Sequence, residues 1–279
     1  MTTAADKTRK DVRAKYRLER KLSKKLNTLN RQIVREFRKN YAESGVILNA
    51  QNYRDDLDVM LQKHYQEVGD QFSDILSKEL PDDVSITEEE ENIIAEALGI
   101  YYLTRADDQS KLISETNQQE ITQSVEEGIT AANEADEPFT RVAAAIFAST
   151  LLLRKFNARR ETVVITETQN VAEAAKITEA EVLGGLTPSI NSRDRKETKN
   201  TKEWVSVGDE RVRQTHVAAD GQVVPVNEVY IVGGFSMMFP GDTNWGAPLS
   251  EVVNCRCSSQ YDTVEIINFR RQRGQSDDS

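Results

Sequence analysis

The chain has few of the residues on which small extracellular scaffolds and fibrous proteins depend. Its 279 residues include two cysteines, six prolines and 13 glycines, and aromatic residues make up 6%. Two cysteines cannot supply a disulfide scaffold, and the pattern Cys255-Arg256-Cys257 indicates a reducing compartment. The low proline and glycine content excludes a collagen-like or low-complexity chain.

Long hydrophobic runs are also absent. The longest, VAAAIFASTLLL, covers the 12 residues 142–153, which is too short to span a bilayer and favours a buried helix. Basic residues near the N-terminus are not followed by an apolar core, so a signal peptide is not expected. These features predict a soluble intracellular protein with no membrane partner.

Charge is distributed unevenly along the chain. Residues 1–40 carry 14 basic and 4 acidic side chains, a net of +10, whereas the other residues carry 22 basic and 42 acidic side chains, a net of -20. An asymmetry of this kind is typical of a segment that interacts with a partner.

The basic segment 1–40 also has a helical period. Apolar side chains recur every three or four residues from Leu18 to Phe37, with basic residues on the other faces, which predicts an amphipathic helix. It could dock on an acidic partner, contact DNA phosphates, or pack on its own acidic body. The candidate contact residues are Leu22, Leu26, Leu29, Ile33, Arg13, Lys15, Arg17, Arg20, Lys21, Lys24, Lys25, Arg31, Arg35 and Arg38.

Residues 41–158 are expected to form a helical body. Helical spacing predicts a helix over 51–80, a second that starts at Ser85 or Thr87 and runs to Arg105, and a third from Ser110 or Ser114 to about residue 132. The next begins near Pro138, and the pattern stays helical over 159–183 until Gly184 and Gly185.

The composition changes after that helix. Residues 184–201 form a polar linker, and short segments rich in valine and aromatic residues within 202–261 predict strands separated by turns. Residues 262–279 are polar, and we expect them to be disordered. The predicted fold is α+β, with long helices first and a small β-rich module after them.

Six short motifs follow one another over residues 159–261. They are a T-E-T helix segment with Glu167, K-x-W ending at Trp204, G-D-x-R-V-R-x-x-H, G-x-x-V-P-V, P-G-D and N-C-R-C. Together they resemble the phage Mu F-like minor head protein family. The residues that carry the resemblance are Glu167, Trp204, Asp209, Arg211, Arg213, His216, Gly221, Pro240, Gly241, Asp242, Asn254, Cys255 and Cys257.

The resemblance implies a phage virion protein that acts in head assembly or in packaging and delivery of the genome. It implies a location in the head near the portal, in few copies, with the host cytoplasm as the place of assembly. The implied partners are the portal protein and other head proteins, with genomic DNA as an alternative bound by the basic segment.

The β-rich module also contains residue types that bind metals. His216, Cys255, Cys257 and Asp209 would make four ligands for a structural zinc ion if the fold brought them together. Two reduced thiols with a hydrogen-bonded histidine, or a transient disulfide, are the alternatives. Apart from this zinc site, no cofactor is expected.

Two further readings concern Asp209, Arg211 and Arg213, which alternate along an expected strand edge. They would form an ion-pair network with Glu167 and Glu210 that fixes the strand to the preceding helix. An enzyme that uses Glu167, Arg213 and His216 as base, anion clamp and acid is the alternative. No phosphate-binding glycine loop or nucleophile elbow is present, so we expect no catalytic activity.

Overall fold

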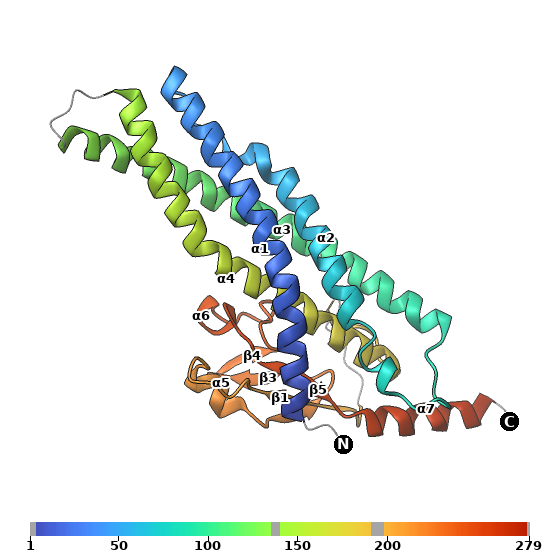
Figure 1. The fold of residues 1–279 in the computed structure, drawn as a ribbon. Coiled ribbons are helices and arrows are strands. Elements are labelled where there is room, and N and C mark those ends of the chain that lie inside the picture. The colour runs from blue at the N-terminus through green and yellow to red at the C-terminus, as the bar shows by residue number, and fades with distance from the viewer. Residues whose placement is uncertain (1–3, 135–139, 191–197, 278–279) are drawn as a thin grey trace. The chain divides into compact units, whose positions relative to one another are not determined.

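A computed structural model describes residues 4–134, 140–190 and 198–277 of the chain. Long helices come first and short antiparallel strands follow, which confirms the predicted α+β fold (Figure 1). The long helices are α1 (Ala4–Ser44), α2 (Arg54–Phe72), α3 (Glu88–Glu134) and α4 (Arg141–Leu183). Pro138 and residues 191–197 of the expected linker lie outside the described residues.

The chain divides into two compact units. Unit 1 contains residues 1–19, 64–103 and 165–279, and unit 2 contains residues 20–63 and 104–164. Each of the four long helices has residues in both units. This division differs from the expected succession of 1–40, 41–158 and 159–261, because the ends of the chain contribute to the same unit.

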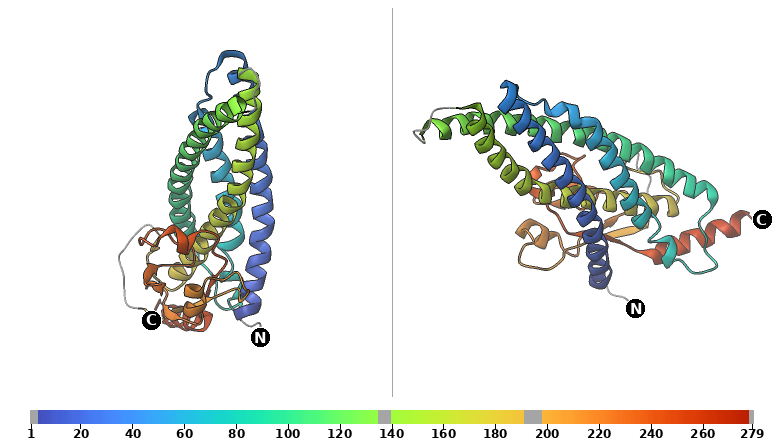
Figure 2. Two further views of the ribbon diagram at one scale, coloured as in Figure 1. Left: turned by 90° about the vertical axis from the view of Figure 1, so that its left-hand side faces the viewer. Right: turned by 45° about the horizontal axis from the view of Figure 1, so that its top comes forward.

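The apolar stripe of α1 forms as predicted but faces inward. Leu22, Leu26, Leu29 and Ile33 are at most 6% exposed. The segments of α1, α2, α3 and α4 in unit 2 run side by side (Figures 1 and 2), and helices packed in this way bury their apolar faces against one another. In this fold the four side chains are core residues and are not exposed for docking on a partner.

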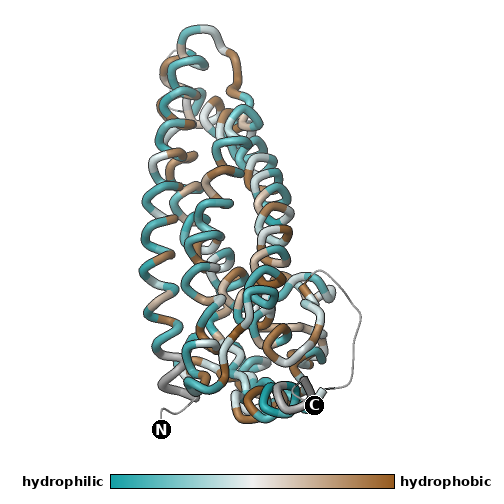
Figure 3. The backbone as a smooth tube through the Cα atoms, turned by 90° about the vertical axis from the view of Figure 1, so that its right-hand side faces the viewer, coloured by the Kyte–Doolittle hydropathy of each residue, from teal (hydrophilic) through white to brown (hydrophobic). Residues whose placement is uncertain are grey.

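Polar contacts join the helix segments of unit 2. The Arg159 guanidinium pairs with Glu120 at 2.8 Å, which connects α4 to α3. Arg160 donates to the Asn27 side chain at 2.9 Å, which connects α4 to α1. Hydrophilic and hydrophobic residues alternate along these helices (Figure 3), as expected for segments with one inward face.

The apolar run 142–153 is only half buried. Ala144, Ala148 and Leu152 are fully buried, whereas Val142 and Phe147 are 54% and 43% exposed. The run lies in a helix of unit 2 with one face toward solvent, which corrects the expectation of a buried helix. No helix in the described part of the chain has the length and apolarity to cross a membrane.

The start of α3 and the end of α4 lie where short sequence signals predict them. Thr87 and Glu90 form a capping box at the start of α3: the Thr87 hydroxyl accepts from the Glu90 amide at 3.2 Å, and the Glu90 carboxylate accepts from the Thr87 amide at 2.9 Å. At the end of α4, Gly185 adopts a φ of +72°. The amides of Gly185 and Leu186 donate back to carbonyls of the last turn, as in a Schellman motif.

Two helix boundaries differ from the sequence prediction. α2 ends at Phe72 and is followed by a short 3-10 helix, Ser77–Glu79, instead of running to residue 80. α3 is continuous where a break was expected between Arg105 and Ser110. The Ser110 hydroxyl donates to the carbonyl of Asp107 at 2.9 Å within the helix and does not cap a new one.

The β-rich module contains two small antiparallel sheets. β1 (Thr201–Val205) lies between β2 (Val223–Pro225) and β5 (Ser258–Tyr261). β3 (Tyr230–Val232) and β4 (Phe235–Met237) form a hairpin through Gly233 and Gly234, which both have positive φ, as this tight turn requires. Short helices α5 (Gln214–Ala219) and α6 (Leu249–Val252) lie between the strands.

The C-terminal segment is a helix and not a disordered tail. α7 (Thr263–Asp277) buries Ile266 completely. Arg270 makes two hydrogen bonds of 2.7 and 2.8 Å to Glu90, the same carboxylate that caps α3. A buried apolar residue and a bidentate arginine pair give the polar segment the tertiary contacts that its composition alone does not predict.

Candidate functional site

The second half of α4 is buried although it is polar. Every residue from Glu167 to Leu183 is buried, and the segment Glu167-Thr168-Gln169-Asn170 interrupts an otherwise alanine-rich helix. Buried polar groups need hydrogen-bond partners because an unpaired one costs about 1–3 kcal/mol. The partners of this segment identify what the T-E-T motif does in the fold.

One set of partners consists of the other sequence motifs. The Gln169 amide donates to the carbonyls of Pro240 and Cys257 at 3.1 and 2.8 Å. The Asn170 amide donates to the carbonyl of Gly241 at 2.6 Å. The Thr166 hydroxyl accepts from the Asn254 amide at 3.2 Å. The P-G-D and N-C-R-C motifs are therefore held by adjacent residues of one helix.

A second set of partners lies on α2. The Tyr65 hydroxyl donates to Glu167 at 2.6 Å, and His64 Nε2 lies 2.8 Å from the Thr168 hydroxyl. All four side chains are buried. α4 therefore hydrogen bonds to α2 through Glu167 and Thr168 and to the β-rich module through Gln169 and Asn170.

A buried network of charges lies one turn further along α4. Lys176 Nζ lies 2.8 Å from Asp11 and 2.9 Å from Glu173, and Lys15 Nζ lies 2.7 Å from Glu173. The Ser258 hydroxyl contacts both carboxylates, at 3.0 and 3.1 Å. Two ammonium and two carboxylate groups balance, so α1, α4 and β5 meet in unit 1 without a net buried charge.

Burial and pairing oppose each other in this network. Burial alone would raise the pKa of Asp11, but the charges of Lys176 and Lys15 lower it below its usual value. Burial alone would lower the pKa of Lys176, but Asp11 and Glu173 raise it. Both groups are therefore ionised in the folded protein at neutral pH.

Motif residues also stabilise the β-rich module itself. Lys202 of the K-x-W motif is buried and donates to the carbonyl of Met238 at 2.6 Å. The Asp242 carboxylate accepts from the amides of Met238 and Asn244 at 2.9 and 2.8 Å. The carbonyl of Trp204 accepts from the amide of Gly221, which has a φ of +77°. These contacts explain the K-x-W, P-G-D and G-x-x-V-P-V motifs as turn and sheet chemistry.

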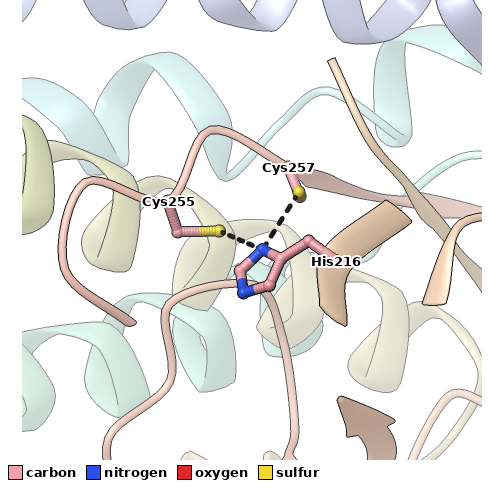
Figure 4. A group of neighbouring side chains, drawn as sticks. All are labelled: His216, Cys255 and Cys257. Atoms are coloured by element: carbon pink, nitrogen blue, oxygen red, sulfur yellow. Dashed lines mark hydrogen bonds between the residues drawn. The ribbon is translucent and has the colours of Figure 1, made fainter. Parts of the chain in front are cut away.

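Three metal-binding residue types meet inside this module. His216 lies on α5, and Cys255 and Cys257 lie between α6 and β5; all three are at most 2% exposed. Both sulfur atoms face the same ring nitrogen, with His216 Nδ1 3.7 Å from Cys255 Sγ and 3.4 Å from Cys257 Sγ (Figure 4). We call these residues the Cys-His cluster.

Neighbouring groups hold the cluster in place. On the far side of the imidazole, Nε2 lies 3.2 Å from a carboxylate oxygen of Glu251. The Trp204 ring meets the His216 ring edge to face, with centroids 5.3 Å apart. Asn254 has a φ of +56°, a conformation that asparagine tolerates better than most residues, and it turns the chain just before Cys255.

The pKa values of the two thiols in the cluster are shifted in opposite directions. A hydrogen bond from Cys257 and the neighbouring His216 lower the pKa of Cys255 to about 5, against the effect of burial. The same hydrogen bond, together with burial, raises the pKa of Cys257. Burial alone would lower the pKa of His216, but Cys255 raises it. The imidazole of His216 therefore favours the thiolate form of Cys255.

Asp209 is not part of the Cys-His cluster, which corrects the expected fourth ligand. Its carboxylate makes a bidentate pair with Arg256, with two contacts of 2.8 Å, at the surface. Residues 209–213 form a turn and not a strand, so Asp209, Arg211 and Arg213 do not alternate along a strand edge. Arg211 is exposed, and Arg213 donates to the carbonyl of Val253.

The expected catalytic set is distributed over different contacts. Glu167 is buried against Tyr65, Arg213 contacts a backbone carbonyl near α6, and His216 belongs to the Cys-His cluster. The structure therefore gives each residue separate partners. The sequence motifs indicated the right residues, but the contacts that they make are those of a folded scaffold.

The basic residues of α1 remain at the surface with one exception. Lys15 is buried in the charge network, which corrects its assignment as a contact residue. Lys25 is half-buried, and the other basic side chains of the candidate set are exposed: Arg13, Arg17, Arg20, Lys21, Lys24, Arg31, Arg35 and Arg38.

Sequence reasoning missed the polar side chains that connect the motifs. Gln169, Asn170, Glu173 and Lys176 were not singled out, because a polar residue in a helix usually indicates a solvated face. A usable signal was present: these residues occur on several faces of a helix whose remaining positions are mostly alanine or valine. A helix that is polar at such positions without an amphipathic pattern needs partners on all sides.

Comparison with known proteins identifies the family. The sequence model of the family described as phage Mu protein F like matches residues 115–260, which is 146 of the 279 residues. The chain belongs to this phage Mu protein F like family. The match confirms the resemblance seen in the motifs and extends it toward the N-terminus into α3. No curated protein and no solved structure matches the chain.

Membership gives the coarse function. The phage Mu protein F like family is one of phage head morphogenesis proteins, so the chain is assigned to head morphogenesis and to the virion. Contacts with other phage head proteins are implied in the same way.

Proposed function

We propose that this chain is a minor head protein that acts in few copies near the portal and assists DNA packaging or delivery. The observation that carries the proposal, beside the family, is a set of exposed cations in unit 2. Arg20, Lys24, Arg31, Arg35 and Arg38, here called the basic stripe, recur at steps that place them on one side of α1. The buried apolar residues Leu22, Leu26, Leu29 and Ile33 occupy the opposite side.

The basic stripe is suited to an anionic partner. Within the described residues, none of its members makes a salt bridge, although the protein as a whole has a net charge of -10. Cations that are not neutralised internally attract acidic surfaces and speed association with them. An acidic face of the portal protein or of another head protein is the partner that we propose.

A second candidate partner is genomic DNA. Because the leucine side chains of α1 are buried, α1 offers a partner its exposed side, on which the cations of the basic stripe lie. Cations spaced along a helix can neutralise phosphates and release counterions. The same basic stripe therefore serves either partner, and the experiment must distinguish them.

Point variants test the proposal better than truncation does. Deleting residues 1–40 would also remove Asp11 and Lys15 from the buried charge network. The stripe triple Lys24→Glu/Arg31→Glu/Arg35→Glu changes only exposed residues of unit 2. The control triple Lys63→Glu/Lys111→Glu/Arg154→Glu makes the same change in net charge at other exposed positions of unit 2.

We expect the wild type and the control triple to co-purify with the portal protein encoded by the same phage. The stripe triple should fail to co-purify with it. Binding to DNA that falls steeply with salt, with a slope lowered by about three in the stripe triple, would instead support DNA as the partner. Equal portal binding and equal DNA binding by both triples would exclude the basic stripe from either contact.

A further inference from the structure

The Cys-His cluster has the separation that one metal ion imposes on its ligands. In tetrahedral zinc sites the Zn–S and Zn–N bonds of about 2.3 and 2.0–2.1 Å keep sulfur and nitrogen about 3.6 Å apart. The observed separations between His216 Nδ1 and the sulfur atoms of Cys255 and Cys257 are 3.7 and 3.4 Å. All three ligand atoms lie within 4.8 Å of one another.

The cluster has the outer contacts of a metal site as well. A histidine that binds a metal through one nitrogen usually donates from the other to a carboxylate, which fixes the ring orientation. Here His216 Nδ1 faces both sulfur atoms, and Nε2 lies 3.2 Å from a carboxylate oxygen of Glu251, which is an ion-pair distance without the alignment of a hydrogen bond. Glu251 is itself fixed, because it accepts from the Thr215 hydroxyl at 2.8 Å.

Charge and surroundings favour a soft divalent ion. Two thiolates and a neutral imidazole neutralise a dication, so the loaded cluster would carry no net charge. This suits its position among Trp204, Tyr230 and Val252 in the core of the module. Thiolate and imidazole ligands are the set that zinc prefers, whereas calcium and magnesium prefer oxygen.

We propose that His216 Nδ1, Cys255 Sγ and Cys257 Sγ bind one zinc ion, with Glu251 as the residue that orients His216 and water as the fourth ligand. Binding replaces the protons of the thiols with the metal and releases them to solvent, and no oxidant or reductant takes part. The ion would join α5 to the segment before β5, in a module whose strands have three to five residues.

The test uses the full chain, purified under reducing conditions without a metal-affinity tag. We expect inductively coupled plasma mass spectrometry to find about one zinc ion per chain. Cobalt(II) added to the metal-free chain should give a thiolate-to-cobalt charge-transfer band and the intense visible bands of tetrahedral cobalt. Because these bands report sulfur ligands directly, the result does not depend on whether any variant folds.

Variants separate the ligands from their neighbours. Cys255→Ser, Cys257→Ser and His216→Gln should each weaken zinc binding by far more than Glu251→Gln, for which about a 10- to 100-fold loss is expected. Asp209→Asn removes the nearby surface carboxylate, and His64→Gln removes a buried histidine of unit 1 outside the cluster. Both controls should bind zinc as the wild type does.

Three outcomes would overturn the proposal. The first is a reduced wild-type chain, with both thiols titratable, that binds neither zinc nor cobalt at micromolar concentration. The second is equal metal binding by the Cys255→Ser/Cys257→Ser chain, which would place the ion elsewhere. The third is a native disulfide between the two cysteines in a chain whose reduced form takes up no metal.

Discussion

Lys176 makes four polar contacts in the interior of unit 1. Its ammonium contacts Asp11, Glu173, the Ser258 hydroxyl and the carbonyl of Ser259, all from inside the protein. A buried charge that loses its partner is costly, whereas a complete buried network contributes little net free energy. The effect of the network on stability is therefore best measured by removing one of its members.

Lys176→Met should lower the free energy of unfolding by about 3–5 kcal/mol, because two carboxylates would then share one ammonium in the protein interior. Urea unfolding of the full chain measures the change. Lys199→Met, at an exposed lysine of the same unit, is the matched control and should change the free energy by less than about 0.5 kcal/mol. A similar small loss for both variants would contradict the network.

The pH dependence of Asp11 has a definite sign. Its pKa in the folded protein is lowered from the usual 3.8, so its contribution to stability is present above that value and is lost as the pH falls through the lower folded pKa. Asp11→Asn should therefore be less stable than the wild type at pH 6, and the difference should shrink below about pH 4. Urea unfolding at several pH values measures it; a difference that grows in acid would contradict this assignment.

At the residue scale the sequence predicts which residues matter better than what they contact. His216, Cys255 and Cys257 meet as expected, because cysteine and histidine in one small module have few alternative positions. Asp209 does not join them, since its nearest cation, Arg256, stands between the cysteines in sequence and takes the carboxylate at the surface. A pair between residues so far apart cannot be predicted from the sequence around either of them.

Among the elements, α7 depends most on tertiary contacts. Arg270 pairs with Glu90 where both side chains are about 10% exposed, and Arg271 pairs with Asp83 where both are at least 50% exposed. The two neighbouring arginines thus provide a natural comparison between a buried and an exposed ion pair.

Arg270→Ala should destabilise the attachment of α7 by about 1–3 kcal/mol, because the Glu90 carboxylate loses two charge-assisted hydrogen bonds. Arg271→Ala should cost at most about 1 kcal/mol, since its pair is solvated. Hydrogen exchange of the amides of residues 263–273 measures both effects. Equal protection in the two variants would show that Ile266, and not the ion pair, holds the helix.

Element boundaries were predictable where backbone chemistry is local. The capping box at Thr87 and the helix end at Gly184-Gly185 each depend on a few adjacent residues, and both are present. The continuity of α3 and the helical state of α7 were not predictable in this way. They depend on partners such as Glu90, which lies 180 residues from Arg270 in sequence.

For the whole molecule, the division into units assigns the two halves of the basic segment 1–40 to different units. Residues 1–19 belong to unit 1 together with the β-rich module, and Asp11 and Lys15 contact α4 there. The uneven charge along the sequence predicted a segment that interacts with a partner, but charge totals do not show which individual cations are buried.

Removal of residues 1–16 should therefore destabilise unit 1 and not only abolish partner binding. We expect a lower thermal midpoint and faster proteolysis of residues 198–261, because Lys176 and Glu173 would lose Asp11 and Lys15 as partners. The chain with Lys10→Gln/Arg13→Gln, which changes exposed residues of the same segment, serves as the control. An unchanged midpoint after the deletion would restore the view of an independent arm.

The contact between Asp11 and Ser258 has a consequence for synthesis on the ribosome. These residues are 247 positions apart, so Asp11 remains without this partner until Ser258 has been made. Contacts of such separation slow folding because a long loop must close first. Unit 1 is therefore expected to fold only after Ser258 has left the ribosome, whereas unit 2, whose last residue is 164, can fold while the residues after it are still being translated.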